Sequence, residues 1–177
     1  MSAENFKLPE KFDRIFAIHL MHWIKDQPKT LKNIFIHLKP QGKIYFILAP
    51  DNKGSPWERA LQKTLKSWRA EFLDFKNPQY LYDIESYRKL VIGSGFHIQN
   101  MSYTHYQKDY ADKVQFGDWV KQSQPHYQYL PLEKKEKFLD NLIENYRVIS
   151  GQKSNKKVVW SEYILTIEAT RPEDSLS

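Results

Sequence analysis

The sequence predicts an α/β fold, and three observations carry that prediction. Residues 12–18 and 43–50 are short, mostly apolar runs, rich in the aromatic and branched residues that favour buried strands. Between them lies a segment with the apolar spacing of one helix face, seen at Leu31, Ile34, Phe35 and Leu38. A strand, a helix and a second strand in this order form a βαβ unit, in which both strands run parallel in one sheet.

The first helix has clear start and stop signals. Asp26 is a suitable N-cap, and Pro28 fits the first helical turn, where its missing N–H costs nothing. The stretch KPQG ends the helix, because Pro40 cannot continue it and Gly42 permits a turn. Residues 44–49 are apolar at nearly every position, which predicts a strand covered on both faces, as in a parallel sheet.

The rest of the chain continues this alternation. Ser55 and Glu58 form a capping box around Pro56 and predict an amphipathic helix from Ser55 to about Phe75. The same criteria predict a helix at 83–92, a strand at 96–106, a helix within 130–150 and a strand at 158–170. There is no internal repeat and no linker long enough to divide the chain. We therefore expect a single domain over 1–177, with a disordered tail over 171–177.

Composition limits the classes of function. A chain of 177 residues with 41% hydrophobic and 15% aromatic residues is typical of a globular domain. It has no apolar run of roughly 20 residues, no secretory signal pattern and no cysteine, so we expect a cytoplasmic protein without disulfides. The formal net charge of +6 suits anionic substrates, nucleic acid or acidic membrane, but the basic residues are scattered among acids. A solvated surface is the favoured interpretation, with no nucleic-acid or membrane partner.

Residues 8–50 carry a family resemblance. They contain FDRIFAI, then HW, then Asp26 before a helix, then LKPQG before a strand. This order resembles the central segment of class I S-adenosylmethionine-dependent methyltransferases, in the branch of juvenile hormone acid and trans-aconitate methyltransferases. That branch has LKPGG where this chain has Gln41. The stretch YRKLVIGSGF also resembles the helix that precedes the penultimate strand of the family.

The resemblance implies a partial Rossmann-like methyltransferase fold. The family's sheet has the order 3-2-1-4-5-7-6 with the last strand antiparallel, and this chain supplies strands ordered 4-5-7-6 with flanking helices. The amino-terminal cofactor-binding strands, with their glycine-rich turn and ribose-binding acid, have no counterpart, and no GxGxG occurs among the six glycines. The sequence is thus interpreted as the truncated, carboxy-terminal portion of a small-molecule methyltransferase. We expect it not to be competent alone.

The same resemblance assigns cofactor-binding residues. Ala17, Ile18 and His19, just past the first strand, would line the methionine end of S-adenosylmethionine. Ala3 belongs to the stretch SAENF, in which Ser2 stands where the family has an adenine-binding aspartate. We expect the chain alone to bind S-adenosylmethionine weakly or not at all.

His22, Trp23 and Trp57 are the substrate-binding candidates. By resemblance, His22 and Trp23 face the junction of cofactor and acceptor, and Trp57 lines the acceptor pocket. The residues themselves leave alternatives. His22 can be a histidine whose hydrogen bonds are made within a strand-to-helix corner, and Trp23 can be a core aromatic. Trp57 can pack in the core or in a lid. The pair His19 and His22 has no third ligand at a metal-site spacing, so no metal site is expected. No catalytic residue is assigned, because transfer to an anionic acceptor such as a carboxylic acid depends chiefly on positioning.

Partners follow from the same fold. Without the family's strand one, residues 12–18 form a sheet edge beside apolar surface, which is a template for pairing with another chain. We expect a homodimer, or association with the missing amino-terminal half. Two alternatives to an enzyme remain open: a non-catalytic methyltransferase-like binding or oligomerisation module, and, less favoured, a basic protein that binds nucleic acid or membrane.

Overall fold

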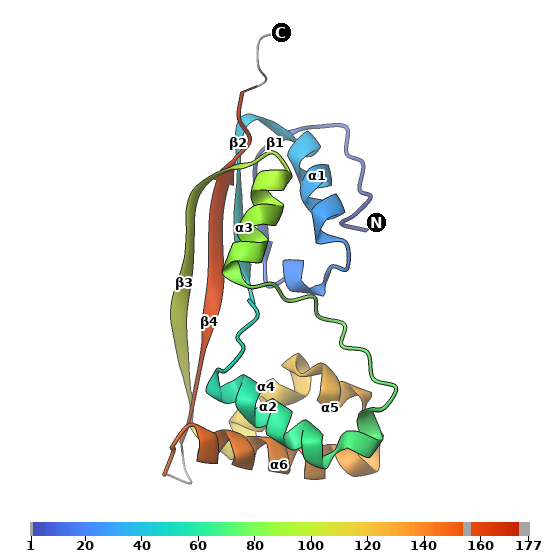
Figure 1. Cartoon of the computed structure of the whole chain (residues 1–177), viewed down its shortest axis with the longest axis vertical. Coiled ribbons are helices and arrows are strands. Elements are labelled where there is room, and N and C mark those ends of the chain that lie inside the picture. The colour runs from blue at the N-terminus through green and yellow to red at the C-terminus, as the bar shows by residue number, and fades with distance from the viewer. Residues whose placement is uncertain (1, 154–156, 174–177) are drawn as a thin grey trace. The chain divides into compact units, whose positions relative to one another are not determined.

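The computed structural model describes residues 2–153 and 157–173, and within them it shows one mixed four-stranded sheet with helices (Figure 1). The strands are β1 (Phe12–Ile18), β2 (Leu38–Leu48), β3 (His97–Tyr110) and β4 (Val158–Thr170), in the order β1-β2-β4-β3. β1 is parallel to β2, and β4 is antiparallel to β2. This is the 4-5-7-6 order predicted from the sequence, so the α/β class and the partial Rossmann-like arrangement are confirmed.

The chain divides into two compact units. The first unit holds residues 1–51, 79–104 and 163–177, and the second holds 52–78 and 105–162. Each has its own cluster of buried apolar side chains. The single domain over 1–177 stays a prediction.

In the first unit, α1 (Gln27–His37) begins as the sequence predicts. The Asp26 side chain accepts a hydrogen bond from the Lys29 N–H at 2.9 Å. The strand that follows begins at Leu38, earlier than the expected residue 43. Its register with β1 shifts between Phe12 and Arg14, and Gln41 takes a left-handed φ of 63° within it. The helix therefore ends at His37, and Pro40 lies within an irregular strand rather than in a separate turn.

Both helices of the first unit, α1 and α3 (Ile84–Gly93), cover the same face of the sheet (Figure 1). On that face the core includes Leu31, Ile34, Ile44, Phe46, Leu48, Tyr87, Val91, Leu165 and Ile167. Phe16, Ile18 and Tyr45 alternate with buried residues along their strands and are exposed on the other face. The prediction that β2 is covered on both faces is therefore wrong at Tyr45.

Arg171 closes the carboxyl end of α1. It was expected in the tail, but it is buried, and its Nη1 donates to the backbone oxygens of Phe35 at 3.3 Å and Leu38 at 2.7 Å. Its guanidinium lies 4.9 Å from the centre of the Phe35 ring. A cation suits the negative end of a helix, so this contact holds β4 against α1. Residues 174–177, the rest of the predicted tail, lie outside the described residues.

The second unit is built mainly from helices: α2 (Pro56–Ser67), the 3-10 turn η2 (Arg69–Phe72), α4 (Lys113–Ser123), α5 (Pro125–Tyr129) and α6 (Leu132–Ile149). The Ser55 cap is present, but α2 ends at Ser67 rather than near Phe75. α4 and α5 were not predicted. The signal for α4 was the N-cap Asp112, which accepts from the Gln115 N–H at 2.8 Å, followed by apolar residues at helical spacing. The signal for α5 was Pro125 at its first position.

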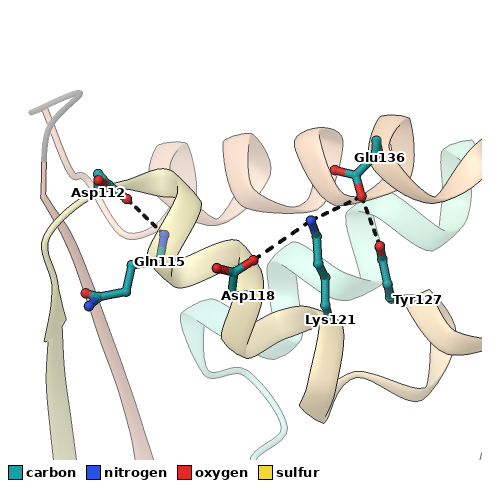
Figure 2. Close-up of polar contacts among 6 residues, drawn as sticks. All are labelled: Asp112, Gln115, Asp118, Lys121, Tyr127 and Glu136. Atoms are coloured by element: carbon teal, nitrogen blue, oxygen red, sulfur yellow. Dashed lines mark hydrogen bonds and ion pairs between the residues drawn. The ribbon is translucent and has the colours of Figure 1, made fainter.

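Figure 2 shows the polar contacts that link α4, α5 and α6. Lys121 on α4 pairs with Glu136 on α6 at 3.2 Å, and the Tyr127 hydroxyl of α5 donates to the same carboxylate at 3.0 Å. The pKa of Lys121 is raised, chiefly by its hydrogen bond to Glu136. All three groups lie near the surface, where such pairs contribute little to stability. The second unit is therefore held together by its aromatic core.

Candidate functional site

The carboxyl ends of β1 and β2 lie side by side, since the two strands are parallel and Ile18 is in register with Ile47. His19 follows β1 directly and donates its N–H to the Ile47 oxygen at 2.7 Å. Its φ of 51° is in the left-handed region, which is uncommon for a residue other than glycine. In open α/β sheets, ligands bind outside the carboxyl ends of the strands. This edge is therefore the candidate site.

His22 joins the two strand ends. It lies in the 3-10 turn η1 (Met21–Trp23), is only 4% exposed, and its Nδ1 accepts a hydrogen bond from the Ala49 N–H, just past β2, at 3.3 Å. Burial, and secondarily the charge of His19, lower the pKa of His22 to about 4. The imidazole is thus neutral near pH 7. Because Nδ1 accepts, the ring carries its proton on Nε2.

Trp23 supplies an open aromatic surface beside this histidine. Its side chain is 42% exposed, and its ring centre lies 5.4 Å from that of His22. The centre of the His19 ring lies 6.4 Å from that of His22, and the two rings are nearly perpendicular. The structure therefore brings together three of the predicted site residues, His19, His22 and Trp23, at one edge of the sheet.

A segment near residue 80 borders the same edge. The Tyr80 N–H donates to the His22 backbone oxygen at 2.8 Å, and the Tyr80 oxygen accepts from Gln27 Nε2 at 2.7 Å. Gln27 is fully buried at the start of α1, and in the described part of the chain its Oε1 is buried without a hydrogen-bond partner. Sequence reasoning missed both residues. The one available signal was a polar residue on the buried side of the helix, directly after the Asp26 cap.

The other predicted residues lie elsewhere. Ile18 is next to His19 but exposed on the sheet face opposite α1, whereas Ala17 points into the core of the first unit. Ala3 packs against that core, and its backbone oxygen accepts from Asn33 Nδ2 on α1 at 3.4 Å. Their roles in cofactor binding stay predictions.

Trp57 belongs to the second unit. It packs edge-on against Phe116, Trp119 and Tyr146, with ring centres 5.4–5.9 Å apart. This is the core packing that the sequence analysis weighed against an acceptor-pocket role, and that role stays a prediction.

Among residues 2–153 and 157–173, no three His, Asp or Glu side chains gather as metal ligands would. No described helix combines the length and apolar character that crossing a membrane requires.

Residues 2–100 of this chain match the methyltransferase domain family. The chain belongs to that family. The match covers more than half of the sequence and includes β1, α1, β2 and the candidate site.

A curated relative points the same way. The chain is 25% identical over 179 aligned positions to the juvenile hormone acid O-methyltransferase of Drosophila melanogaster. The alignment covers 93% of this chain and 60% of the relative, so the chain spans less than two thirds of that protein's length.

Solved structures share the fold. A proposed methyltransferase of Bacillus halodurans superposes with a TM-score of 0.62 at 14% identity, over 97% of this chain and 70% of its own. A phosphoethanolamine N-methyltransferase 2 of Haemonchus contortus, solved with phosphomonomethylethanolamine and S-adenosylhomocysteine, gives 0.51 at 13% identity, over 97% of this chain and 36% of its own. The methyltransferase fold class predicted from the sequence is thereby confirmed.

Proposed function

We propose that this chain forms the acceptor side of an S-adenosylmethionine-dependent methyltransferase that acts on a small molecule, with a carboxylic acid as the preferred class. The observation that carries the proposal is the buried, neutral His22, bound through Nδ1 to the Ala49 N–H at the edge where β1 and β2 end. Family membership supports methyl transfer, and the name of the Drosophila relative supports an acid as acceptor.

The residues at this edge suit an anionic acceptor. Nδ1 of His22 accepts from the Ala49 N–H, so its Nε2–H is the donor that can orient a carboxylate oxygen. A carboxylate already carries the electron pair that attacks, so no general base is required and positioning supplies most of the catalysis.

The residues at the edge where β1 and β2 end also fit the reactive end of the methyl donor. S-adenosylmethionine supplies a methyl group bound to a positively charged sulfur. A neutral His22 does not repel that charge, and the exposed face of Trp23 attracts a cation. The 177 residues include no glycine-rich turn for the rest of the cofactor. We therefore expect the polypeptide alone to bind it weakly and to be incompetent for turnover.

The test is a titration of the 177-residue chain with S-adenosylhomocysteine, followed by NMR. We expect the Trp23 indole and Ala49 amide signals to move at millimolar concentration, with no saturable heat at micromolar concentration in calorimetry. The indoles of Trp68 and Trp160 are internal controls and should stay in place, and Trp23→Leu should abolish the Ala49 shift. Saturation at micromolar concentration contradicts weak binding, and shifts confined to the control tryptophans contradict the site.

A second candidate is a non-catalytic methyltransferase-like module for binding or oligomerisation. Two observations favour it: the exposed edge of β1 and the lack of a glycine-rich turn within the 177 residues. The titration with S-adenosylhomocysteine separates the two, because a module without a methyl-donor site leaves the Trp23 indole and Ala49 amide signals in place. The lack of cysteine supports a reducing compartment, the cytoplasm, for either candidate.

A further inference from the structure

Residues 80–82 form a segment that joins the two strand ends of the candidate site. The Tyr80 N–H donates to the His22 oxygen, beyond β1, at 2.8 Å. The Tyr82 oxygen accepts from the Asp51 N–H, beyond β2, at 2.9 Å. The segment is therefore bound next to the ends of both strands, at the edge where ligands bind in open α/β sheets.

Gln27, the first residue of α1, holds this segment through its side chain. Its Nε2 donates to the Tyr80 oxygen at 2.7 Å, so both backbone groups of Tyr80 are bonded. We infer that Gln27 is a positioning residue of the methyl-transfer site, which fixes residues 80–82 and, through them, the turn that carries His22 and Trp23. This role rests on the proposed function and deepens it, because Gln27 acts on the site through its neighbours and not on the substrate.

A glutamine is a poor choice at this position for stability alone. Gln27 is fully buried, and among the described residues its Oε1 has no hydrogen-bond partner. A buried oxygen without a partner lowers stability, so an apolar side chain of the same length would stabilise the first unit more. The glutamine makes one contact that an apolar residue cannot make, which is the bond from Nε2 to the Tyr80 oxygen.

The position of Tyr80 affects the rings of the candidate site. The 3-10 turn η1 is held by Tyr80 at the His22 oxygen and by the Ala49 N–H at His22 Nδ1. The second of these bonds is long, at 3.3 Å, so a small displacement of the turn would break it. The Trp23 ring belongs to the same turn and lies 5.4 Å from the His22 ring, so a displacement moves both.

The first experiment needs no ligand. Gln27→Met keeps the length of the side chain and removes its donor. Thr30→Val is the matched control, because Thr30 is also buried on α1 but donates to the Asp26 oxygen and not to the segment. Amide hydrogen exchange of Tyr80 should be about tenfold faster in Gln27→Met, since the loss of one hydrogen bond favours local opening by roughly that factor. The nitrogen NMR signal of His22 Nδ1 should move in Gln27→Met, and neither change should occur in Thr30→Val.

A purely structural role for Gln27 would give a different result. Phe46 is fully buried in β2, and its amide exchange follows the opening of the whole first unit. We expect this exchange to be the same in Gln27→Met as in the unmodified chain. Equal acceleration at Tyr80 and Phe46 would show that Gln27 only stabilises the unit, and unchanged exchange at Tyr80 would show that it does not hold the segment. Either outcome overturns the proposal.

Tyr80→Pro is an independent variant that leaves Gln27 in place. It removes the N–H that binds the His22 oxygen, so the His22 Nδ1 signal should move as it does in Gln27→Met. An unmoved His22 signal in Tyr80→Pro would show that residues 80–82 do not hold the turn, and this outcome also overturns the proposal.

The second experiment links the segment to the ligand. In a titration with S-adenosylhomocysteine, the Trp23 indole and Ala49 amide signals of Gln27→Met should need about tenfold more ligand than those of the unmodified chain or of Thr30→Val. The reason is that apparent affinity falls with the fraction of molecules whose site is in place. No response in the unmodified chain contradicts the proposed function, and hydrogen exchange then decides the role of Gln27. Equal responses in the unmodified chain and in Gln27→Met overturn the proposal and leave the proposed function in place.

Discussion

His22 in the first unit and His126 in the second have the same electrostatic character and different surroundings. Both are buried, and burial lowers the pKa of each to about 4. The His126 ring is enclosed by Phe72 and Phe75, with ring centres 5.4 and 4.3 Å away, and its Nδ1 bonds to the Gln124 side chain. A lowered histidine pKa therefore reports burial and does not by itself mark a site.

What distinguishes His22 is its position in the fold. It lies where two parallel strands end, it is bound to a backbone N–H just past the second strand, and Trp23 beside it is open to solvent. The contrast extends to the units as a whole. The second unit buries most of its aromatic side chains in one cluster, whereas the first leaves Phe16, Ile18 and Tyr45 exposed on one sheet face. The exposed apolar face of the sheet thus belongs to the first unit.

The largest expected effects come from the two cores. Phe46→Ala in the first unit and Phe138→Ala in the second remove fully buried rings, and each should lower the free energy of unfolding by about 3–5 kcal/mol. Trp23 lies in the first unit and the other four tryptophans lie in the second, so tryptophan fluorescence mainly follows the second unit. If the chain is a single domain, both variants should shift the fluorescence and far-ultraviolet dichroism transitions together. Separate transitions would show that the units unfold independently.

The next largest effects are two opposite pH dependences of stability in the second unit, one from Glu162 and one from His126. Burial raises the pKa of Glu162 to about 8 from 4.5, so the folded state holds a proton that the unfolded state releases, and stability falls as pH rises from about 4.5 to 8. His126, with its pKa lowered from 6.5 to about 4, has the reverse effect, and stability is lost as pH falls through that range.

Urea denaturation at several pH values tests this pair. Between pH 5 and pH 8, Glu162→Gln should remove a loss of stability on the order of 3 kcal/mol. His126→Phe should remove a similar loss between pH 7 and pH 4. An unchanged pH profile in Glu162→Gln would mean that the carboxyl is solvated in the folded protein.

The smallest expected changes in stability come from substitutions at or beside glycines in the two units. A Cβ at Gly42 would lie 2.8 Å from the Lys39 oxygen and 3.1 Å from the Phe12 oxygen, so Gly42→Ala should cost about 1–2 kcal/mol. Gln41→Gly, next to it, should stabilise by about 0.5–1 kcal/mol, because Gln41 has a φ of 63°. In the second unit, Gly117→Ala should be nearly neutral. Its Cβ would meet only side chains, Leu139 at 3.3 Å and Ile143 at 3.7 Å, and alanine favours the helix. Thermal denaturation of the three variants checks the order, and a stabilised Gly42→Ala would contradict it.

Local signals in the sequence were sufficient for much of the fold. Asp26, Ser55 and Asp83 each cap a helix as their spacing predicts, and the last strand runs over residues 158–170 as expected. These elements follow from short-range chemistry, that is, side chains that bond the next turn and apolar residues that repeat with a fixed period. The family resemblance supplied the strand order.

The remaining features depended on contacts between distant residues. β2 begins at Leu38 because its first residues find a partner in Phe12, a pairing that no local pattern encodes. The sequence placed His22 and Trp23 at the strand-to-helix corner. Only the tertiary structure showed that His22 bonds to Ala49, and that Tyr80 and Gln27, 53 residues apart, close the same edge. A hydrogen bond across such a separation has no periodic signature, since it forms only when packing has already brought the two segments together.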